Sequence, residues 1–221
     1  MDKYSRLLIG LVPFTLYGMA YAGEIITTPG LYVVGGDIVD TSTGTSGPVV
    51  TIATSNVIFD LSEHLLYQDP VPSGTTSVGI AIEPGLSNIV IQNGSIGPIG
   101  GIGIVVGEGC SNILVRDIAL SGCSRAGLAT VGSSGNPISG VTILASSITS
   151  CTGNIAERIA GFDASYTNAF IARDSYFSHI ENTGGDGFGI YCTHCISGEL
   201  INCRNNNNSG QNSAPLKTFL S

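Results

Sequence analysis

The sequence predicts an all-β fold: a single-stranded right-handed parallel β-helix, or solenoid, with about five to six coils of roughly 24–30 residues. Three features of the 221 residues predict it: a small polar pair recurs, a strand that begins with Gly precedes the pair, and an alternating apolar strand follows it. The composition agrees. The 31 glycines disfavour a helical bundle, and a charged fraction of only 11% is too low for ordinary disorder.

The small polar pair is expected to mark a corner of each coil. Its first member is Ser or Thr, and its second is Asn or Gly, the residues that most readily adopt a positive φ in the left-handed region. The sequence therefore predicts one tight left-handed corner per coil. The six expected corners are Ser55-Asn56, Ser87-Asn88, Ser111-Asn112, Ser139-Gly140, Thr167-Asn168 and Ser197-Gly198.

Strands are expected on both sides of each corner. A strand such as Ile89-Val90-Ile91 follows the corner, and apolar residues recur at fixed distances beyond it. One coil cannot bury its inner face alone, so stacked coils must share one interior of like residues. The strands that precede the corner begin at Gly79, Gly103, Gly127, Gly161 and Gly189.

One column of this repeat, eleven residues past the corner, contains Ile99, Cys123, Cys151 and His179. Adjacent coils stack about 4.8 Å apart. Cys123 and Cys151 are therefore expected to lie together as buried thiols, with a disulfide as the alternative. His179 is expected to point inward or to cap a turn.

The N-terminal segment, residues 1–22, has the layout of a secretory signal peptide. Lys3 and Arg6 precede an apolar run that ends in Ala20-Tyr21-Ala22. An uncleaved membrane anchor is the alternative, and no other segment is long and apolar enough to span a membrane. The leader predicts a secreted, cell-surface or periplasmic protein. The other expected segments are an N-terminal opening strand and cover (23–54), the parallel β-helix (55–204) and a polar tail or incomplete C-terminal cover (205–221).

The charge balance limits the classes of binding partner that can be expected. The chain has 16 acidic and 8 basic residues and a net charge of −8. Nucleic acid is not expected as a partner, since phosphate recognition needs a basic surface. An anionic polysaccharide would be repelled unless metal ions bridged the charges. A neutral ligand, a cation or a protein surface fits better. Self-association through an uncapped C-terminal coil is also expected, because unpaired backbone invites pairing.

An N-terminal pattern consists of Gly30, Tyr32, Thr51-Ile52, Asn56-Val57, Asp60-Leu61 and His64. It resembles the first coil of the pectate-lyase-like superfamily of right-handed parallel β-helices, in the branch of periplasmic or secreted carbohydrate-binding and sugar-hydrolase-like proteins. Ser62-Glu63 stands where that family usually has Asn-Gly. The resemblance covers about residues 25–204 and implies this fold. It implies little about chemistry, because the scaffold hosts many activities.

The resemblance directs attention to carboxylates. Lyases of this superfamily combine acidic calcium ligands with an Arg or Lys base, and its hydrolases use two or three aspartates. The hydrolase patterns of the family are absent, and the body of the chain has no Lys. The alternatives to a catalytic role for these polar residues are that they lie in turns or on a solvated surface. Arg116-Asp117 repeats the pair Arg173-Asp174, but the two pairs align only after a one-residue shift. The catalytic candidates are Asp163, Arg173, Asp174, His179 and Asp186, with Glu181 nearby.

A cysteine cluster suggests metal or redox chemistry. Cys192-Thr193-His194-Cys195 contains the CxxC half-site of many zinc sites, and Cys203 follows eight residues later. Cys192, His194, Cys195 and Cys203 are thus candidate metal ligands. A disulfide and free buried thiols are the alternatives. No cofactor is expected beyond a possible calcium or zinc ion.

These features predict an exported, non-catalytic binding or surface protein that uses an outer coil face for a carbohydrate or protein ligand. One alternative is a polysaccharide-modifying enzyme of the glycoside hydrolase or lyase type. It requires Asp163, Asp174 and Asp186 within about 5–9.5 Å of one another. The other alternative is a metal-handling periplasmic accessory protein, which requires the candidate ligands to converge.

Overall fold

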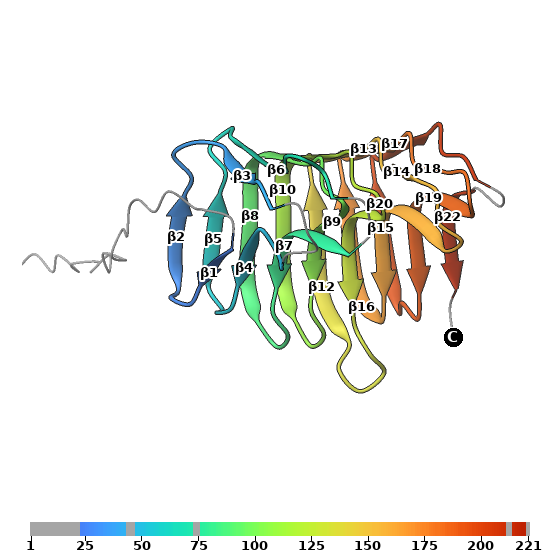
Figure 1. Ribbon diagram of the computed structural model, residues 1–221. Helices are drawn as coiled ribbons and strands as arrows, with labels where there is room; N and C mark the ends of the chain where they lie inside the picture. Colours follow the sequence, from blue (N-terminus) through green and yellow to red (C-terminus); the bar gives the residue numbers. More distant parts are fainter. Residues whose placement is uncertain (1–22, 43–46, 73–75, 211–213, 220–221) are drawn as a thin grey trace, which may run out of the picture.

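The computed structural model describes residues 23–42, 47–72, 76–210 and 214–219, the last range by its backbone only. The expected signal peptide, residues 1–22, lies outside the described residues. Strand accounts for 61% of the described chain, and no helix occurs in it. It therefore contains no helix that is long and apolar enough to cross a membrane. The strands stack into a parallel β-solenoid of about six turns (Figure 1), which confirms the predicted all-β parallel β-helix.

Each coil contributes one strand to a first sheet, named sheet A. Neighbouring strands are parallel and in register, so that Ile80 pairs with Ile104 and Leu128 pairs with Phe162. In spatial order its strands are β1 (Glu24–Ile26), β4 (Val50–Ile52), β7 (Ser77–Ile82), β9 (Gly101–Val106), β11 (Ala126–Val131), β15 (Arg158–Ser165), β19 (Asp186–Thr193) and β22 (Ala214–Phe219).

The second sheet, sheet B, turns into a third face of the solenoid. Asn93 and Asp117, both at positive φ, bend β8 and β10 in the middle, so that each of these strands serves both faces. Sheet B contains β2 (Gly30–Val33), β5 (Val57–Asp60), β8 (Ser87–Ile96), β10 (Ser111–Ser121), β12 (Ile138–Leu144), β16 (Thr167–Arg173) and β20 (Ser197–Ile201). The third face adds β3 (Ile38–Asp40), β6 (Leu65–Gln68), β13 (Ser147–Thr149), β17 (Tyr176–Ser178) and β21 (Arg204–Asn206). A separate pair is β14 (Thr152–Gly153) with β18 (Glu181–Asn182).

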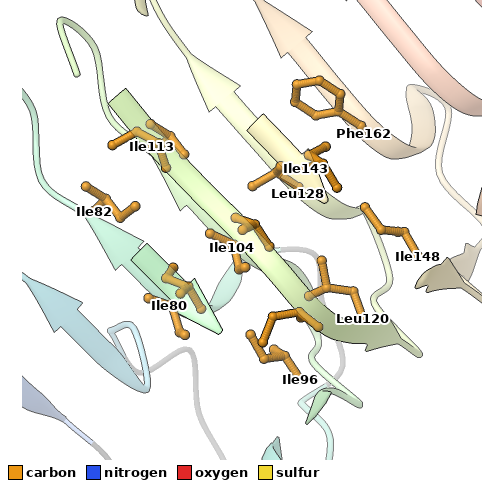
Figure 2. Packing of buried hydrophobic residues seen from close by; sticks show 14 of the residues in the cluster. Ile80, Ile82, Ile96, Ile104, Ile113, Leu120, Leu128, Ile143, Ile148 and Phe162 are labelled. Atoms are coloured by element: carbon orange, nitrogen blue, oxygen red, sulfur yellow. The ribbon is translucent and has the colours of Figure 1, made fainter. Parts of the chain in front are cut away.

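The first corner lies between sheets A and B, the second between sheet B and the third face, and the third leads back to sheet A. Inside these three faces, like residues stack into columns (Figure 2). Ile104 and Leu128 of sheet A and Leu120 of the third face are all fully buried. Phe162 replaces the aliphatic residue in a later coil and packs edge-on against Phe170, with ring centroids 5.3 Å apart. One apolar core therefore runs along the solenoid.

The recurrent glycine, which lies within β7, β9, β11, β15 and β19 of sheet A, leaves room for this core. A Cβ on Gly103 would lie 2.6 Å from Leu120 Cδ2 and 2.6 Å from the carbonyl oxygen of Gly127. A Cβ on Gly79 would lie 3.1 Å from Ile96 of its own coil. A small residue thus faces a large one in each of these coils.

The left-handed corner forms as predicted in four of the six coils. It is occupied by Asn56 (φ 62°), Asn88 (φ 59°), Asn112 (φ 55°) and Gly140 (φ 71°). The side-chain amide of Asn88 donates to Asn56 Oδ1 at 2.9 Å, and that of Asn112 donates to Asn88 Oδ1 at 2.7 Å. A ladder of amides therefore connects three coils along the first corner.

For Asn168 and Gly198 the corner prediction is wrong. In the last two coils the left-handed residue comes earlier in the chain, at Tyr166 (φ 48°) and His194 (φ 54°). The cause is a shorter link between the sheets, since Tyr166 alone separates β15 from β16. The rings of Tyr166 and His194 stack with centroids 4.2 Å apart and planes 7° apart. An aromatic pair thus replaces the amide ladder.

A register irregularity also moves His179 out of the inner column. Pairing shifts on both sides of Ser139, and Thr149 then pairs with Ser178. Ile180, which is fully buried, therefore follows Cys151 in that column. His179 is exposed at positive φ (53°) on the third corner, in agreement with the turn-capping alternative.

Parallel pairing extends on both sides of the range 55–204. Glu24 pairs with Val50, and β21 and the backbone of β22 pair with strands of the preceding coil. The described parts of the two terminal segments are therefore built into the stack.

Candidate binding site on the second corner

The second corner displays polar side chains as a consequence of its backbone. Its left-handed residues have φ between 47° and 58°. Asn and Asp adopt this conformation more readily than other side-chain-bearing residues, because their short polar groups bond locally. Where they do so they point carboxylates and amides outward. The corner residues are Asn93, Asp117, Ala145, Asp174 and Asn202.

A cavity of about 460 Å³ lies on this corner in the last two coils; we name it the C-terminal cavity. Tyr176 and Arg204 occupy paired positions in β17 and β21. Asn202 Nδ2 donates to Asp174 Oδ1 at 2.6 Å, which joins the two coils at the cavity wall. The lining residues are Asp174, Ser175, Tyr176, Asn202, Arg204 and Asn206. One aromatic ring is therefore surrounded by a carboxylate, a guanidinium and amides.

A second cavity of about 750 Å³, the N-terminal cavity, lies on the same corner in earlier coils. Asp60 is engaged by its surroundings, because it accepts hydrogen bonds from Ser62 N (2.8 Å), Gln92 Nε2 (2.7 Å) and Asn93 Nδ2 (3.1 Å). The lining residues are Asp60, Ser62, Glu63, Asn93, Gly94, Ser95 and Asp117. This cavity is acidic and has no aromatic lining residue.

The two Arg-Asp pairs align without the one-residue shift that the sequence suggested. Arg116 pairs with Leu144, and Leu144 pairs with Arg173, because the irregularity at Ser139 absorbs the difference. Leu144 separates the two arginines. Arg116 donates to Gln92 Oε1 at 2.9 Å from Nε, so it stays on its own sheet.

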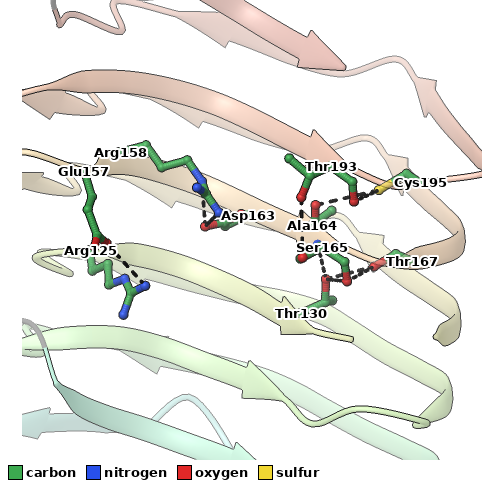
Figure 3. A network of polar contacts seen from close by, with 10 residues as sticks. All are labelled: Arg125, Thr130, Glu157, Arg158, Asp163, Ala164, Ser165, Thr167, Thr193 and Cys195. Atoms are coloured by element: carbon green, nitrogen blue, oxygen red, sulfur yellow. Dashed lines mark hydrogen bonds and ion pairs between the residues drawn. The ribbon is translucent and has the colours of Figure 1, made fainter. Parts of the chain in front are cut away.

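Among the catalytic candidates, Asp163 lies on the outer face of sheet A. Arg158 donates to both of its oxygens, at 3.1 and 3.0 Å (Figure 3). The guanidinium carbon of Arg158 also lies 4.2 Å from the centroid of the Tyr191 ring. The Asp163 side chain is 14% exposed, and this burial raises its pKa, while the charge of Arg158 opposes the rise. Asp163 is therefore a partner in an ion pair on sheet A.

The raised pKa of Asp163 predicts a pH-dependent stability. The folded state binds the proton of the Asp163 carboxyl more tightly than the unfolded chain does. Protonated Asp163 therefore contributes fully to the stability below the ordinary pKa of 3.8, and this contribution is lost as the pH rises through the higher pKa of the folded state. We expect the unfolding temperature of the wild type to fall, relative to that of Asp163→Asn, as the pH rises above 3.8. Melting curves of both proteins across this range test it, and a constant difference would contradict it.

Asp186 lies on sheet A, as Asp163 does. It begins β19 and pairs with Arg158, the residue whose guanidinium binds Asp163. Asp174 lies on another corner, in the C-terminal cavity. Two of the aspartates that the enzyme alternative requires therefore share sheet A, and the third lies on another corner.

The remaining candidates lie outside both cavities. Arg173 is the exposed last residue of β16. His179 lies on the third corner, with its Nδ1 3.0 Å from Ser178 Oγ and its Nε2 3.4 Å from Asn207 Nδ2. Glu181 is exposed in β18.

The candidate metal ligands do not converge. Cys192 and Cys195 are buried, whereas His194 is exposed and stacks on Tyr166. Cys203 donates to the carbonyl of Ala172 at 3.2 Å. Across the described residues, no group of three or more His, Cys, Asp or Glu side chains is placed to hold a metal ion.

All six cysteines are free thiols in the structure. Cys123 and Cys151 lie in hydrogen-bond contact in neighbouring coils. That contact, followed by burial, raises the pKa of Cys123 well above its ordinary value. The predicted ladder of buried thiols is confirmed.

Sequence reasoning found Asp174 but missed the rest of the C-terminal cavity. Tyr176 is not among the predicted site residues, Arg204 ends the range interpreted as the β-helix, and Asn206 falls in the segment interpreted as a polar tail. A usable signal was present: Asp174-Ser175-Tyr176 and Asn202-Cys203-Arg204 are equivalent triplets in successive coils. Comparisons of the chain with protein-family models, curated proteins and solved structures find no match.

Proposed function

We propose that the protein is a non-catalytic binding solenoid whose C-terminal cavity takes a neutral carbohydrate. The observation that carries this proposal is the position of Tyr176 among Asp174, Asn202, Arg204 and Asn206. The C–H face of a sugar ring is apolar and packs on an aromatic ring, while its hydroxyls both donate and accept hydrogen bonds. A cavity with one aromatic platform and a polar rim suits a ligand with both properties.

Charge supports a neutral ligand. The chain has a net charge of −8, and the N-terminal cavity on the same corner adds the carboxylates of Asp60, Glu63 and Asp117. A polyanionic sugar that approaches this corner would meet a repulsive field. Binding without cleavage is supported by the lining of the C-terminal cavity, where Asp174 is the one carboxylate and glycoside cleavage commonly uses two.

The family resemblance and the export of the protein are part of the same proposal. The N-terminal pattern around Asp60 and His64 resembles the carbohydrate-binding branch of the pectate-lyase-like superfamily. Residues 1–22 would direct the chain to the envelope or the exterior. A neutral glycan is a ligand that the protein would meet there.

A glycan array probed with the purified protein tests the ligand class. We expect neutral oligosaccharides to be retained and uronic acid oligosaccharides to be lost. Calorimetry with the best binder then measures Tyr176→Ala, for which we expect a Kd at least about tenfold higher, equal to about 1.4 kcal/mol.

Tyr67→Ala is the matched control, because Tyr67 is also a half-buried tyrosine of the third face but lines neither cavity. Its Kd should equal that of the wild type. The proposal fails if no neutral glycan binds or if both variants lose affinity equally. Shortened products after incubation with the bound oligosaccharide would instead support the enzyme alternative.

A further inference from the structure

The proposed binding site leaves one pair of buried nucleophiles unused. Cys192 lies near the end of β19, and Cys195 lies shortly before β20 begins, in the last coil. Between them His194, at positive φ, turns the chain through the first corner. The two cysteines are 0% and 4% exposed. The corner thus folds a Cys-x-x-Cys segment back on itself.

Both cysteines belong to inner columns that meet at this corner. Cys192 pairs with Ala164, and Ala164 pairs with Thr130. In the earlier coils the meeting point is visible as a hydrogen bond of 2.8 Å between Thr130 Oγ1 and Thr167 Oγ1 (Figure 3). Thr130 and Thr167 belong to neighbouring coils, whereas Cys192 and Cys195 lie on the two sides of the corner within one coil.

The two thiols interact with each other and differ in acidity. The hydrogen bond from Cys192 lowers the pKa of Cys195 to about 7, and the same contact raises the pKa of Cys192. As a thiol, Cys195 also contacts the carbonyl oxygens of Thr193 at 3.6 Å and Ala164 at 3.7 Å (Figure 3). A thiolate is the nucleophilic form of cysteine, so Cys195 is the attacking member of the pair.

The chain on both sides of Cys195 lies at the surface of the corner. His194 is exposed, and Ile196 is 73% exposed, so the residues on both sides of Cys195 are at the surface. Cys195 therefore lies directly beneath the surface of the last coil.

We propose that Cys192 and Cys195 form a redox-active dithiol that closes reversibly to a disulfide with a low-molecular-weight disulfide such as oxidised glutathione. The Cys195 thiolate attacks one reagent sulfur, the reagent S–S bond breaks, and one glutathione thiolate leaves. Cys192 then loses its proton and attacks the Cys195 sulfur of the mixed disulfide, which releases the second glutathione. Two electrons pass to the reagent, and two glutathione thiols form.

The Cys123–Cys151 pair serves as an internal contrast. These thiols lie in neighbouring coils, and the pKa of Cys123 is raised well above its ordinary value by the contact with Cys151 and by burial, so Cys123 keeps its proton and is a poor nucleophile. They are also enclosed in the core at 0% exposure. This pair should stay reduced under conditions that oxidise Cys192 and Cys195.

A glutathione redox titration of the purified full chain tests the proposal. After acid quench and denaturation, alkylation and intact mass give the number of free thiols. We expect it to fall from the six thiols of the chain to four, without a retained adduct, and to return to six with dithiothreitol. Fragmentation of the oxidised protein should place the link between Cys192 and Cys195.

Three variants distinguish this pair from the others. Cys203→Ser should lose two thiols as the wild type does, and Cys195→Ser should lose none. Cys192→Ser should trap one glutathione on Cys195, because the second thiol that would displace it is absent. Circular dichroism verifies that each variant is folded. Loss of two thiols in Cys195→Ser, no loss in the wild type at any ratio, or a link at other residues would overturn the proposal, whatever the outcome of the glycan array.

Discussion

Replacement of Phe162 by alanine is expected to lower the free energy of unfolding by about 3–5 kcal/mol. Phe162 is fully buried, lies in the sheet A column with Leu128 and Ile190, and packs edge-on against Phe170. Its removal would leave a cavity that rigid stacked coils cannot close by collapse. A loss of this size is a large part of the total stability of a typical domain. Urea denaturation followed by circular dichroism measures it.

Val131→Ala is the matched control for Phe162→Ala. Val131 also belongs to sheet A, but it is 55% exposed. Its replacement should change the free energy of unfolding by no more than about 0.5 kcal/mol. Similar losses in the two variants would show that Phe162 does not lie in the common core.

Replacement of Gly103 by alanine is expected to destabilise the protein by about 1–3 kcal/mol through overpacking. The new Cβ would lie 2.6 Å from the carbonyl oxygen of Gly127, which belongs to the backbone of the next coil and cannot turn away. It would also lie 2.6 Å from Leu120 Cδ2 and 3.1 Å from Cys123 Sγ. Differential scanning calorimetry should show a lower unfolding temperature.

The control for Gly103→Ala is Gly135→Ala. An added Cβ at Gly135 meets nothing within 4 Å, and Gly135 is not among the glycines with positive φ. Alanine there should be neutral or slightly stabilising, since it reduces the freedom of the unfolded chain. If Gly103→Ala were equally neutral, close packing of the coils would not explain the recurrent glycine.

The repeat made the fold predictable from the sequence. Asn56, Asn88 and Asn112 indicate a left-handed backbone conformation, because few residue types occupy such a corner readily. The recurrent glycine reports a steric requirement, because only a missing side chain leaves space for Leu120 or Ile96. Each of these local requirements restricts the residue type at a single position, so the sequence alone reveals it.

The position of the first corner was predicted wrongly in the last two coils, where the left-handed residue comes earlier in the chain. Tyr166 and His194 adopt the left-handed conformation although neither is Asn or Gly, because stacking between coils and a one-residue link in the first of them determine the corner there. The irregularity at Ser139 then shifted His179 by one position and aligned Arg116 with Arg173. An offset of one residue is enough to move a side chain to another face.

The sequence by itself determined the coil, its period and the apolar interior, since each coil repeats the same local requirements. Only the tertiary structure decided which polar residues meet. It placed Asp163 with Arg158 on sheet A, and it brought Asp174 beside Asn202 across two coils. The physical reason is that neighbours in a solenoid are set by the register between coils. Links of variable length change this register, and the identity of the residues that become neighbours does not reveal the change.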